Sequence, residues 1–112
     1  MTDIQRARDV LAKWREEANA KSAWVFEKGH SGGMYGAWVY ANESGSDTIA
    51  DDIWPDGNAR LIVGLAGNPD LLDAIDELLA MYVSRTAGDP LAPASVRRIA
   101  AAILSADERM SA

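Results

Sequence analysis

The apolar residues between Pro69 and about Arg85 recur at spacings of three and four, which places them on one face of an α-helix. Asn68 can cap this helix with its side chain, and Pro69 suits the first helical position, where a missing N–H costs nothing. The pattern predicts a helix that is the longest or second-longest element of the chain. Three of its residues are expected to be nearly fully buried: Leu72, Ile75 and Leu79. A preceding helical segment, which begins near Asn58, is expected to end at Gly67.

Helical spacing also marks both ends of the chain. Thr2 or Asp3 can cap a first helix that runs to about Ala20, and its apolar stripe is Ile4, Ala7, Val10, Leu11, Trp14 and Ala18. A last helix is expected to follow Ser95, with apolar residues Val96, Ile99, Ala100, Ile103 and Leu104. The tail is expected to fray after about Asp107.

The middle of the chain has a different pattern, with short runs rich in β-branched and aromatic residues. We expect three strands, at residues 23–26, 35–40 and 48–50. Because the connections are short and rich in Gly, Ser and Asn, an antiparallel meander is the simplest topology. Alternation suggests that Trp24, Phe26, Trp38 and Tyr40 share one face and that Val25, Ala37 and Val39 share the other. Both faces are then apolar, so either helices cover both or one meets a partner.

These elements predict one α+β domain over residues 1–112: a helix, a three-stranded sheet and three further helical segments packed on the sheet. A chain of 112 residues with 48% hydrophobic and 25% charged residues is typical of one small globular domain. The chain has no cysteine, which excludes a disulfide scaffold and is compatible with a cytoplasmic location. It has no apolar run near the roughly 18 to 20 residues of a membrane span, so neither a membrane anchor nor a signal peptide is expected.

The net charge of −6 is concentrated in the middle of the chain. Between residues 22 and 57 the only Lys or Arg is Lys28, against Glu27, Glu43, Asp47, Asp51, Asp52 and Asp56. Nucleic-acid binding requires clustered Lys and Arg to replace the counterions of the phosphates. The charge pattern therefore argues against a nucleic-acid partner, although mimicry of DNA by the acidic region stays open.

One stretch of the chain resembles a known group of proteins. A short Trp-containing strand, a Gly-rich hairpin, a strand ending in Asp51-Asp52 and then NARLI…NPDLLDAIDELL resemble small accessory proteins of tailed bacteriophages and prophages. The resemblance covers roughly residues 22–84. It implies a phage-encoded protein that acts in the host cytoplasm, and it implies no enzymatic activity. Val63–Asn68 differ from the short Ala run that often precedes the proline in that group.

The segment Gly29-His30-Ser31-Gly32-Gly33 matches the G-x-S-x-G elbow of serine hydrolases. That chemistry needs a separate histidine supported by a carboxylate, an oxyanion hole and a turn from strand to helix. His30 is the only histidine in the chain, and it lies beside the serine. Because a strand is expected after the elbow, we interpret the segment as a hairpin loop and predict no catalytic residue.

The acidic residues Asp47, Asp51, Asp52 and Asp56 could in principle hold Mg²⁺ or Ca²⁺ through oxygen ligands, but the spacing of a calcium-binding loop is absent. We interpret them as charges that keep a sheet edge soluble. No metal and no cofactor are expected.

Two functions remain as hypotheses. The first is binding to a host or phage protein, with possible modulation of a host or defence protein, through the residues Trp24, Trp38, Tyr40, Asp51 and Asp52. The second is a homo-oligomeric assembly role, in which the helix of residues 71–83 pairs with its copy in a homodimer. A small enzyme is the least supported class, because no convergent polar groups can be named.

Overall fold

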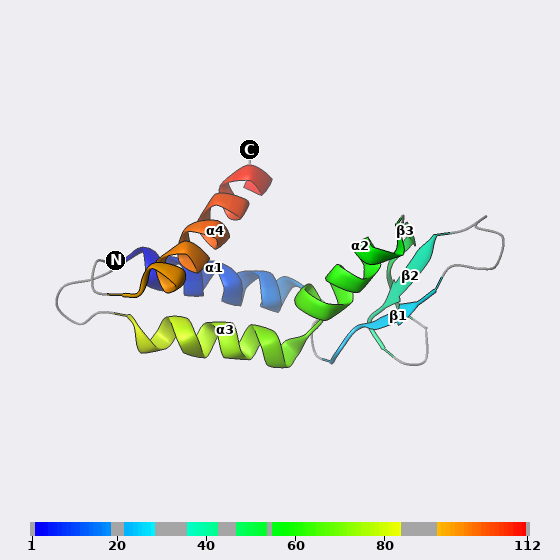
Figure 1. The fold of residues 1–112 in the computed structure, drawn as a ribbon, viewed down its shortest axis with the longest axis horizontal. Helices are drawn as coiled ribbons and strands as arrows, with labels where there is room; N and C mark the ends of the chain where they lie inside the picture. The colour runs from blue at the N-terminus through cyan, green and yellow to red at the C-terminus, as the bar shows by residue number, and fades with distance from the viewer. Residues whose placement is uncertain are drawn as a thin grey trace. The chain divides into compact units, whose positions relative to one another are not determined.

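The computed structural model describes residues 2–18, 22–28, 36–42, 47–53, 55–83 and 92–111, apart from the side chains of Asp52 and Asp56. Its elements are α1 (Asp3–Glu17), β1 (Val25–Glu27), β2 (Ala37–Tyr40), β3 (Thr48–Ile53), α2 (Asp56–Leu61), the π-helix η1 (Ile62–Ala66), α3 (Pro69–Met81) and α4 (Ala94–Ser111) (Figure 1). This order of elements confirms the predicted α+β class. Within the described residues, no helix combines the length and apolar character needed to cross a membrane.

The chain forms two compact units, which we describe separately. The helical unit comprises Met1–Ala18 and Asp73–Ala112, and the sheet unit comprises Asn19–Leu72. Each unit has its own buried cluster of apolar side chains.

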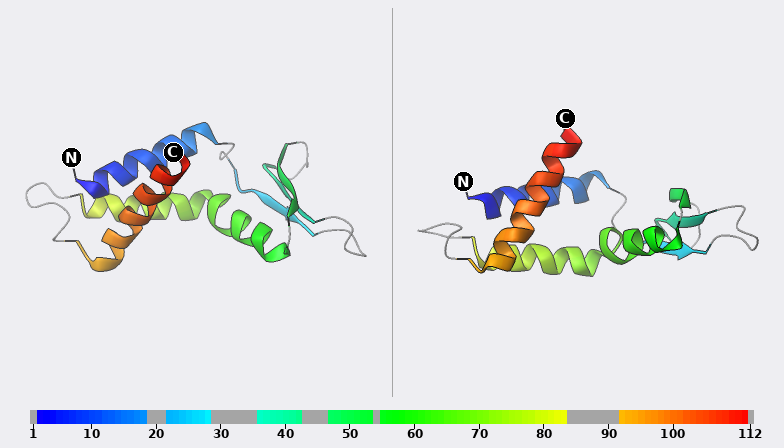
Figure 2. Two further views of the ribbon diagram at one scale, coloured as in Figure 1. Left: turned by 90° about the horizontal axis from the view of Figure 1, so that it is seen from above. Right: turned by 45° about the horizontal axis from the view of Figure 1, so that its top comes forward.

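The core of the helical unit lies between α1, α3 and α4 (Figures 1 and 2). Its buried members are Ile4, Ala7, Leu79, Ala92, Val96 and Ala100. Small residues recur in this set, so the helices can approach closely. The Thr2 hydroxyl caps α1 by accepting a hydrogen bond from the Gln5 amide, which confirms the predicted start of that helix. The Trp14 Nε1–H of α1 donates to the Asp107 carboxylate of α4 at 3.2 Å.

Several helix boundaries and burial predictions were wrong. α1 ends at Glu17 rather than near Ala20, and α4 continues to Ser111 instead of fraying after Asp107. α3 has 13 residues, so it is shorter than α1 with 15 and α4 with 18. Its last turn tightens, because the Tyr82 and Val83 amides donate to carbonyls three residues earlier. Leu79 is fully buried as predicted, but Leu72 and Ile75 are only half-buried.

The sheet unit is an antiparallel meander of order β1-β2-β3, as predicted. α2 and η1 cover one face of this sheet, where Ala37, Val39 and Ala59 are completely buried. Half-buried apolar side chains complete this core: Trp24, Phe26, Ile49, Ile53, Ile62 and Val63. The pairing of β2 with β3 shifts register on both sides of Val39.

The connection from α2 to α3 contains a π-helical turn that the sequence pattern did not predict. The Gly67 amide donates to the Ile62 carbonyl, five residues earlier, at 2.8 Å. The cap of α3 was predicted correctly, because the Asn68 Oδ1 accepts from the Leu71 amide at 3.1 Å. The Asn68 Nδ2 also donates to the Gly64 carbonyl, so one side chain caps both the end of η1 and the start of α3.

Candidate functional site

The strand register places Trp38 and Tyr40 on the face of the sheet opposite to the buried core. Val25 pairs with Tyr40 and Glu27 with Trp38, and residues that pair across antiparallel strands point to the same side. Thr48 of β3 pairs with Tyr40. We call the surface formed by Val25, Glu27, Trp38, Tyr40 and Thr48 the open face. All five residues are half-buried or exposed.

The predicted distribution of aromatic residues over the two faces was wrong. Phe26 pairs with Val39, so Phe26 and Trp24 lie on the core face and not beside Trp38 and Tyr40. A slip of one residue in the pairing of β1 with β2 exchanges the faces of a whole strand. Alternation within each strand was therefore visible in the sequence, but the relation between the strands was not.

The rings of Trp38 and Tyr40 stack on each other, with centroids 6.0 Å apart and planes inclined by 28°. A hydrogen bond with Glu27 raises the pKa of Tyr40, and burial and the negative charge of Asp51 act in the same direction. Tyr40 therefore keeps its proton and remains a neutral phenol beside the Glu27 carboxylate. The open face thus combines a stacked aromatic pair with the Glu27 carboxylate, and the exposed Asp51 is near enough for its charge to act on Tyr40.

The indole Nε1 of Trp38 is buried and has no hydrogen-bond partner. A buried donor without an acceptor costs about 1–3 kcal/mol. The ring is nevertheless held by the stack with Tyr40 and by its place in β2. The placement of Trp38 is therefore not due to a hydrogen bond of its indole N–H.

Trp24, another predicted binding residue, has a structural role in the sheet unit. Its amide donates to the Gly67 carbonyl at 2.8 Å, and its side chain belongs to the core-face cluster. A Cβ added to Gly67 would lie 2.5 Å from the Cβ of Trp24, so the indole occupies the space that a side chain would need. These contacts give the half-buried Trp24 a packing role on the core face.

The predicted acidic site residues are only partly accounted for. Asp47 is exposed just before β3 and Asp51 is exposed within it, whereas the side chains of Asp52 and Asp56 are outside the described part. Among the described residues, no group of three or more His, Asp or Glu side chains could hold a metal ion. The elbow at Gly29–Gly33 also lies outside the described residues.

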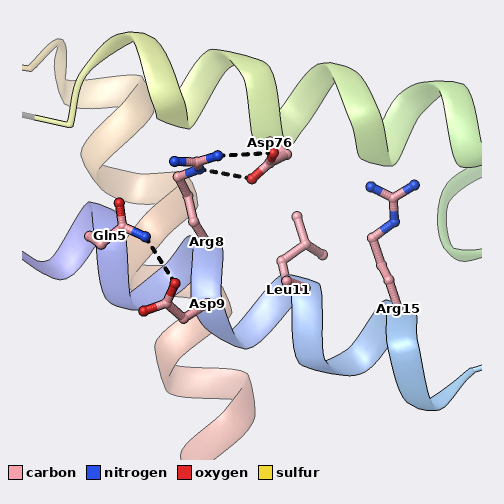
Figure 3. Close-up of a pocket in the computed structure, with 7 residues that line it drawn as sticks. Gln5, Arg8, Asp9, Leu11, Arg15 and Asp76 are labelled. Carbon is pink, nitrogen blue, oxygen red and sulfur yellow. Dashed lines mark hydrogen bonds and ion pairs between the residues drawn. The ribbon is translucent and has the colours of Figure 1, made fainter.

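The helical unit contains a groove of about 180 Å³ between α1 and α3 (Figure 3). It is lined by Gln5, Arg8, Asp9, Leu11, Ala12, Arg15 and Asp76. The Arg8 guanidinium donates through Nε and Nη2 to the two carboxylate oxygens of Asp76, at 2.9 and 3.3 Å. Arg15 pairs with Asp73 at 2.7 Å, and the side-chain Nε2 of Gln5 donates to the Asp9 carboxylate.

The polar groups of this groove neutralise one another. The hydrogen bond from Arg8 lowers the pKa of Asp76, and the same bond raises the pKa of Arg8. Each guanidinium already has a carboxylate partner, so neither is free to hold an anion. The described lining includes no hydroxyl, thiol or imidazole that could act as a nucleophile. We therefore interpret the groove as the polar seam that joins α1 to α3.

Two features of the candidate site were not found from the sequence. Glu27 is one of several acidic residues in the middle of the chain, and only the register places it opposite Trp38. Arg8 and Asp76 are 68 positions apart, and neither belongs to a recognisable motif. Helical spacing does place Arg8 and Arg15 on one side of α1, seven residues apart, which is the only signal for that seam.

No protein-family model, no curated protein sequence and no solved structure matches this chain. The comparisons therefore add nothing to the resemblance to phage accessory proteins, which stays an expectation from sequence.

Proposed function

We propose that this protein is a non-enzymatic binding module that holds a protein partner on the open face of its sheet. The observation that carries the proposal is the stacked pair of Trp38 and Tyr40 on the face opposite the core. When helices cover one face of an antiparallel sheet, the opposite face is normally polar. Here it presents two large aromatic rings and Val25.

Aromatic residues on such a surface suit protein recognition. Trp and Tyr are enriched among the residues that contribute most to binding energy. Because the two rings already stack in the free chain, binding needs to immobilise less side-chain freedom. Glu27, Thr48 and Asp51 are exposed and provide the polar rim that such interfaces have.

The proposal keeps the sequence-based expectation of a phage accessory protein that modulates a host or defence protein in the host cytoplasm. Its partner would then be a host or phage protein. The absence of cysteine is compatible with that compartment.

Affinity isolation with paired charge reversals tests the proposal. Glu27→Lys changes the open face, and Glu108→Lys changes an exposed carboxylate of α4 in the helical unit. Both variants alter the net charge equally, so only the position differs. We expect a partner that is retained by the wild type and by Glu108→Lys, and that is lost from Glu27→Lys and from Trp38→Ala. A partner retained equally by all four proteins, or no retained partner, would contradict the proposal.

Self-association is the second candidate function. Leu61 and Leu65 are four positions apart on α2 and η1 and are 62% and 54% exposed. In contrast, α3 and the two residues that follow it pack against the core of the helical unit through Ile75, Leu78, Tyr82 and Val83. This packing uses much of the apolar surface that was expected to form a homodimer. If the chain does self-associate, Leu61→Gln with Leu65→Gln should convert the dimer to a monomer in light scattering at micromolar concentration.

A further inference from the structure

We infer that the open face receives a positively charged side chain, arginine or lysine, from an extended segment of the protein partner. This inference rests on the proposed function and specifies the chemistry of the partner. Its evidence is the arrangement of rings and carboxylates on the open face, together with an equivalent contact on the opposite face.

The sheet already holds one cation over an aromatic ring. On the core face, the guanidinium carbon of Arg60 lies 4.5 Å from the centroid of Phe26. Indole has a more electron-rich face than the phenyl ring, so Trp38 is the stronger acceptor for such a contact. Among the described residues, no Lys or Arg has a cation–π contact with Trp38 or Tyr40.

The carboxylates of the open face complement the same charge. Glu27 lies opposite Trp38 in the register and is hydrogen-bonded to Tyr40, and the charge of Asp51 also acts on Tyr40. A guanidinium over these rings can donate to a carboxylate while its plane stacks on the indole. Lys28 is the only Lys or Arg between residues 22 and 57, so this region attracts cations and repels anionic partners such as nucleic acids.

The spacing of the rings indicates an extended partner segment. Trp38 and Tyr40 are two residues apart on β2 and therefore point to the same side of the strand. A second extended chain that carries basic residues at alternate positions presents them with the same period. A helix would place alternate residues on different faces.

A titration with short peptides tests the inference on the whole chain. The probe is a capped Gly/Ser peptide with two arginines at alternate positions, and the matched peptides contain lysine or citrulline in their place. Citrulline keeps the planar shape of arginine but has no charge. Two-dimensional NMR of the ¹⁵N-labelled protein follows the backbone amides of β1 and β2 and the Trp38 indole.

We expect saturable shifts at Glu27, Trp38 and Tyr40 with the arginine and lysine peptides. Loss of the charge should weaken binding about tenfold, both with citrulline and in the variant Glu27→Gln, which retains an acceptor oxygen. The control Glu108→Gln should bind as the wild type does. Equal binding of citrulline and arginine, shifts centred elsewhere, or no shifts would overturn the inference.

The outcomes also separate the inference from the proposed function. If a protein partner is lost from Trp38→Ala but is retained by Glu27→Gln and Asp51→Asn and is insensitive to salt, the open face binds without a cation and only the inference fails. If the partner is indifferent to Trp38→Ala in a variant whose amide spectrum shows the native fold, the proposed function itself fails.

Discussion

Gly67 lies in close contact with Trp24, and this contact leaves no room for a side chain at position 67. The backbone at this position has φ −90°, which any residue adopts, so the requirement is for space and not for an unusual conformation. Both the Cβ and the ring of Trp24 lie where a side chain at position 67 would begin. The Cβ is fixed by the backbone, so it cannot rotate away.

We therefore predict that Gly67→Ala destabilises the protein by about 1–3 kcal/mol, the usual cost of overpacking. Gly64→Ala is the matched control, because a Cβ at that helical position has no neighbour within 4 Å. Ala is favoured over Gly in a helix by about 1 kcal/mol, so this control should be neutral or stabilising. Urea unfolding measures both, and a Gly67→Ala protein as stable as Gly64→Ala would refute the close contact.

The Asp76–Arg8 pair predicts a specific pH dependence at the same scale. The hydrogen bond from Arg8 lowers the pKa of Asp76 in the folded protein, so the pair stabilises above the unfolded pKa of about 4. That contribution is lost as the pH falls through the folded pKa, because Arg8 keeps its charge and Asp76 becomes neutral. The Arg8 side chain is 30% exposed and the Asp76 side chain is 36% exposed, so solvent screens the pair.

Asp76→Asn should consequently be less stable than the wild type at pH 7 by about 0.5–1 kcal/mol. The difference should shrink as the pH falls from about 4 through the lowered folded pKa of Asp76, because the wild-type carboxyl then becomes neutral too. Denaturant unfolding at several pH values tests this, with Glu77→Gln, at an exposed position of α3, as the control. A difference that persists unchanged at low pH would show that the effect is not the ion pair.

Among the helices and strands, the starts of α1 and α3 were predicted correctly from their capping residues. Thr2 and Asn68 both cap helices as their side chains predicted. Such caps are local, because donor and acceptor are three residues apart. The π-helical turn at Ile62–Ala66 was not predictable, since its pattern resembles that of any short apolar helix.

Asn68 performs two tasks, so its removal should be more costly than the loss of one cap. We predict that Asn68→Ala destabilises by about 1–2 kcal/mol, near the upper end of the range for helix caps. Asn68→Asp keeps the acceptor for the Leu71 amide but not the donor to the Gly64 carbonyl, so it should recover part of the loss. Equal stability of Asn68→Ala and the wild type in urea would contradict this assignment.

Packing of α3 is testable through Leu79, which is completely buried in the helical core. Leu79→Ala should cost about 2–5 kcal/mol through the lost contacts and the cavity. Met81 is two positions away and 74% exposed, so Met81→Ala should change stability by no more than about 0.5 kcal/mol. Similar losses in both variants, measured by helical circular dichroism in urea, would show that α3 packs by another face.

At the scale of the molecule, the α+β class and the order of the sheet followed from residue patterns, because periodicities of two and of three to four are local properties. The distribution of residues over two cores did not follow, since it depends on tertiary contacts. Trp24 is an example. Its residue type suggested an interface anchor, but in the structure it packs in the space left by the missing side chain of Gly67. Trp38 and Tyr40 were predicted as binding residues from their residue types alone, and only the register shows that they lie on one face of the sheet.

If the open face binds a protein partner, its aromatic side chains should lose access to solvent in the complex. Hydroxyl-radical footprinting with mass spectrometry compares the oxidation of Trp38 and Tyr40 in the free chain and in the complex with the partner isolated on the wild-type protein. Trp14 serves as the internal reference, because its indole is bound to Asp107 in the helical unit. We predict that both open-face residues are oxidised in the free chain and protected several-fold in the complex, while Trp14 is unchanged. Equal oxidation of Trp38 and Tyr40 in the free and bound protein would contradict the account.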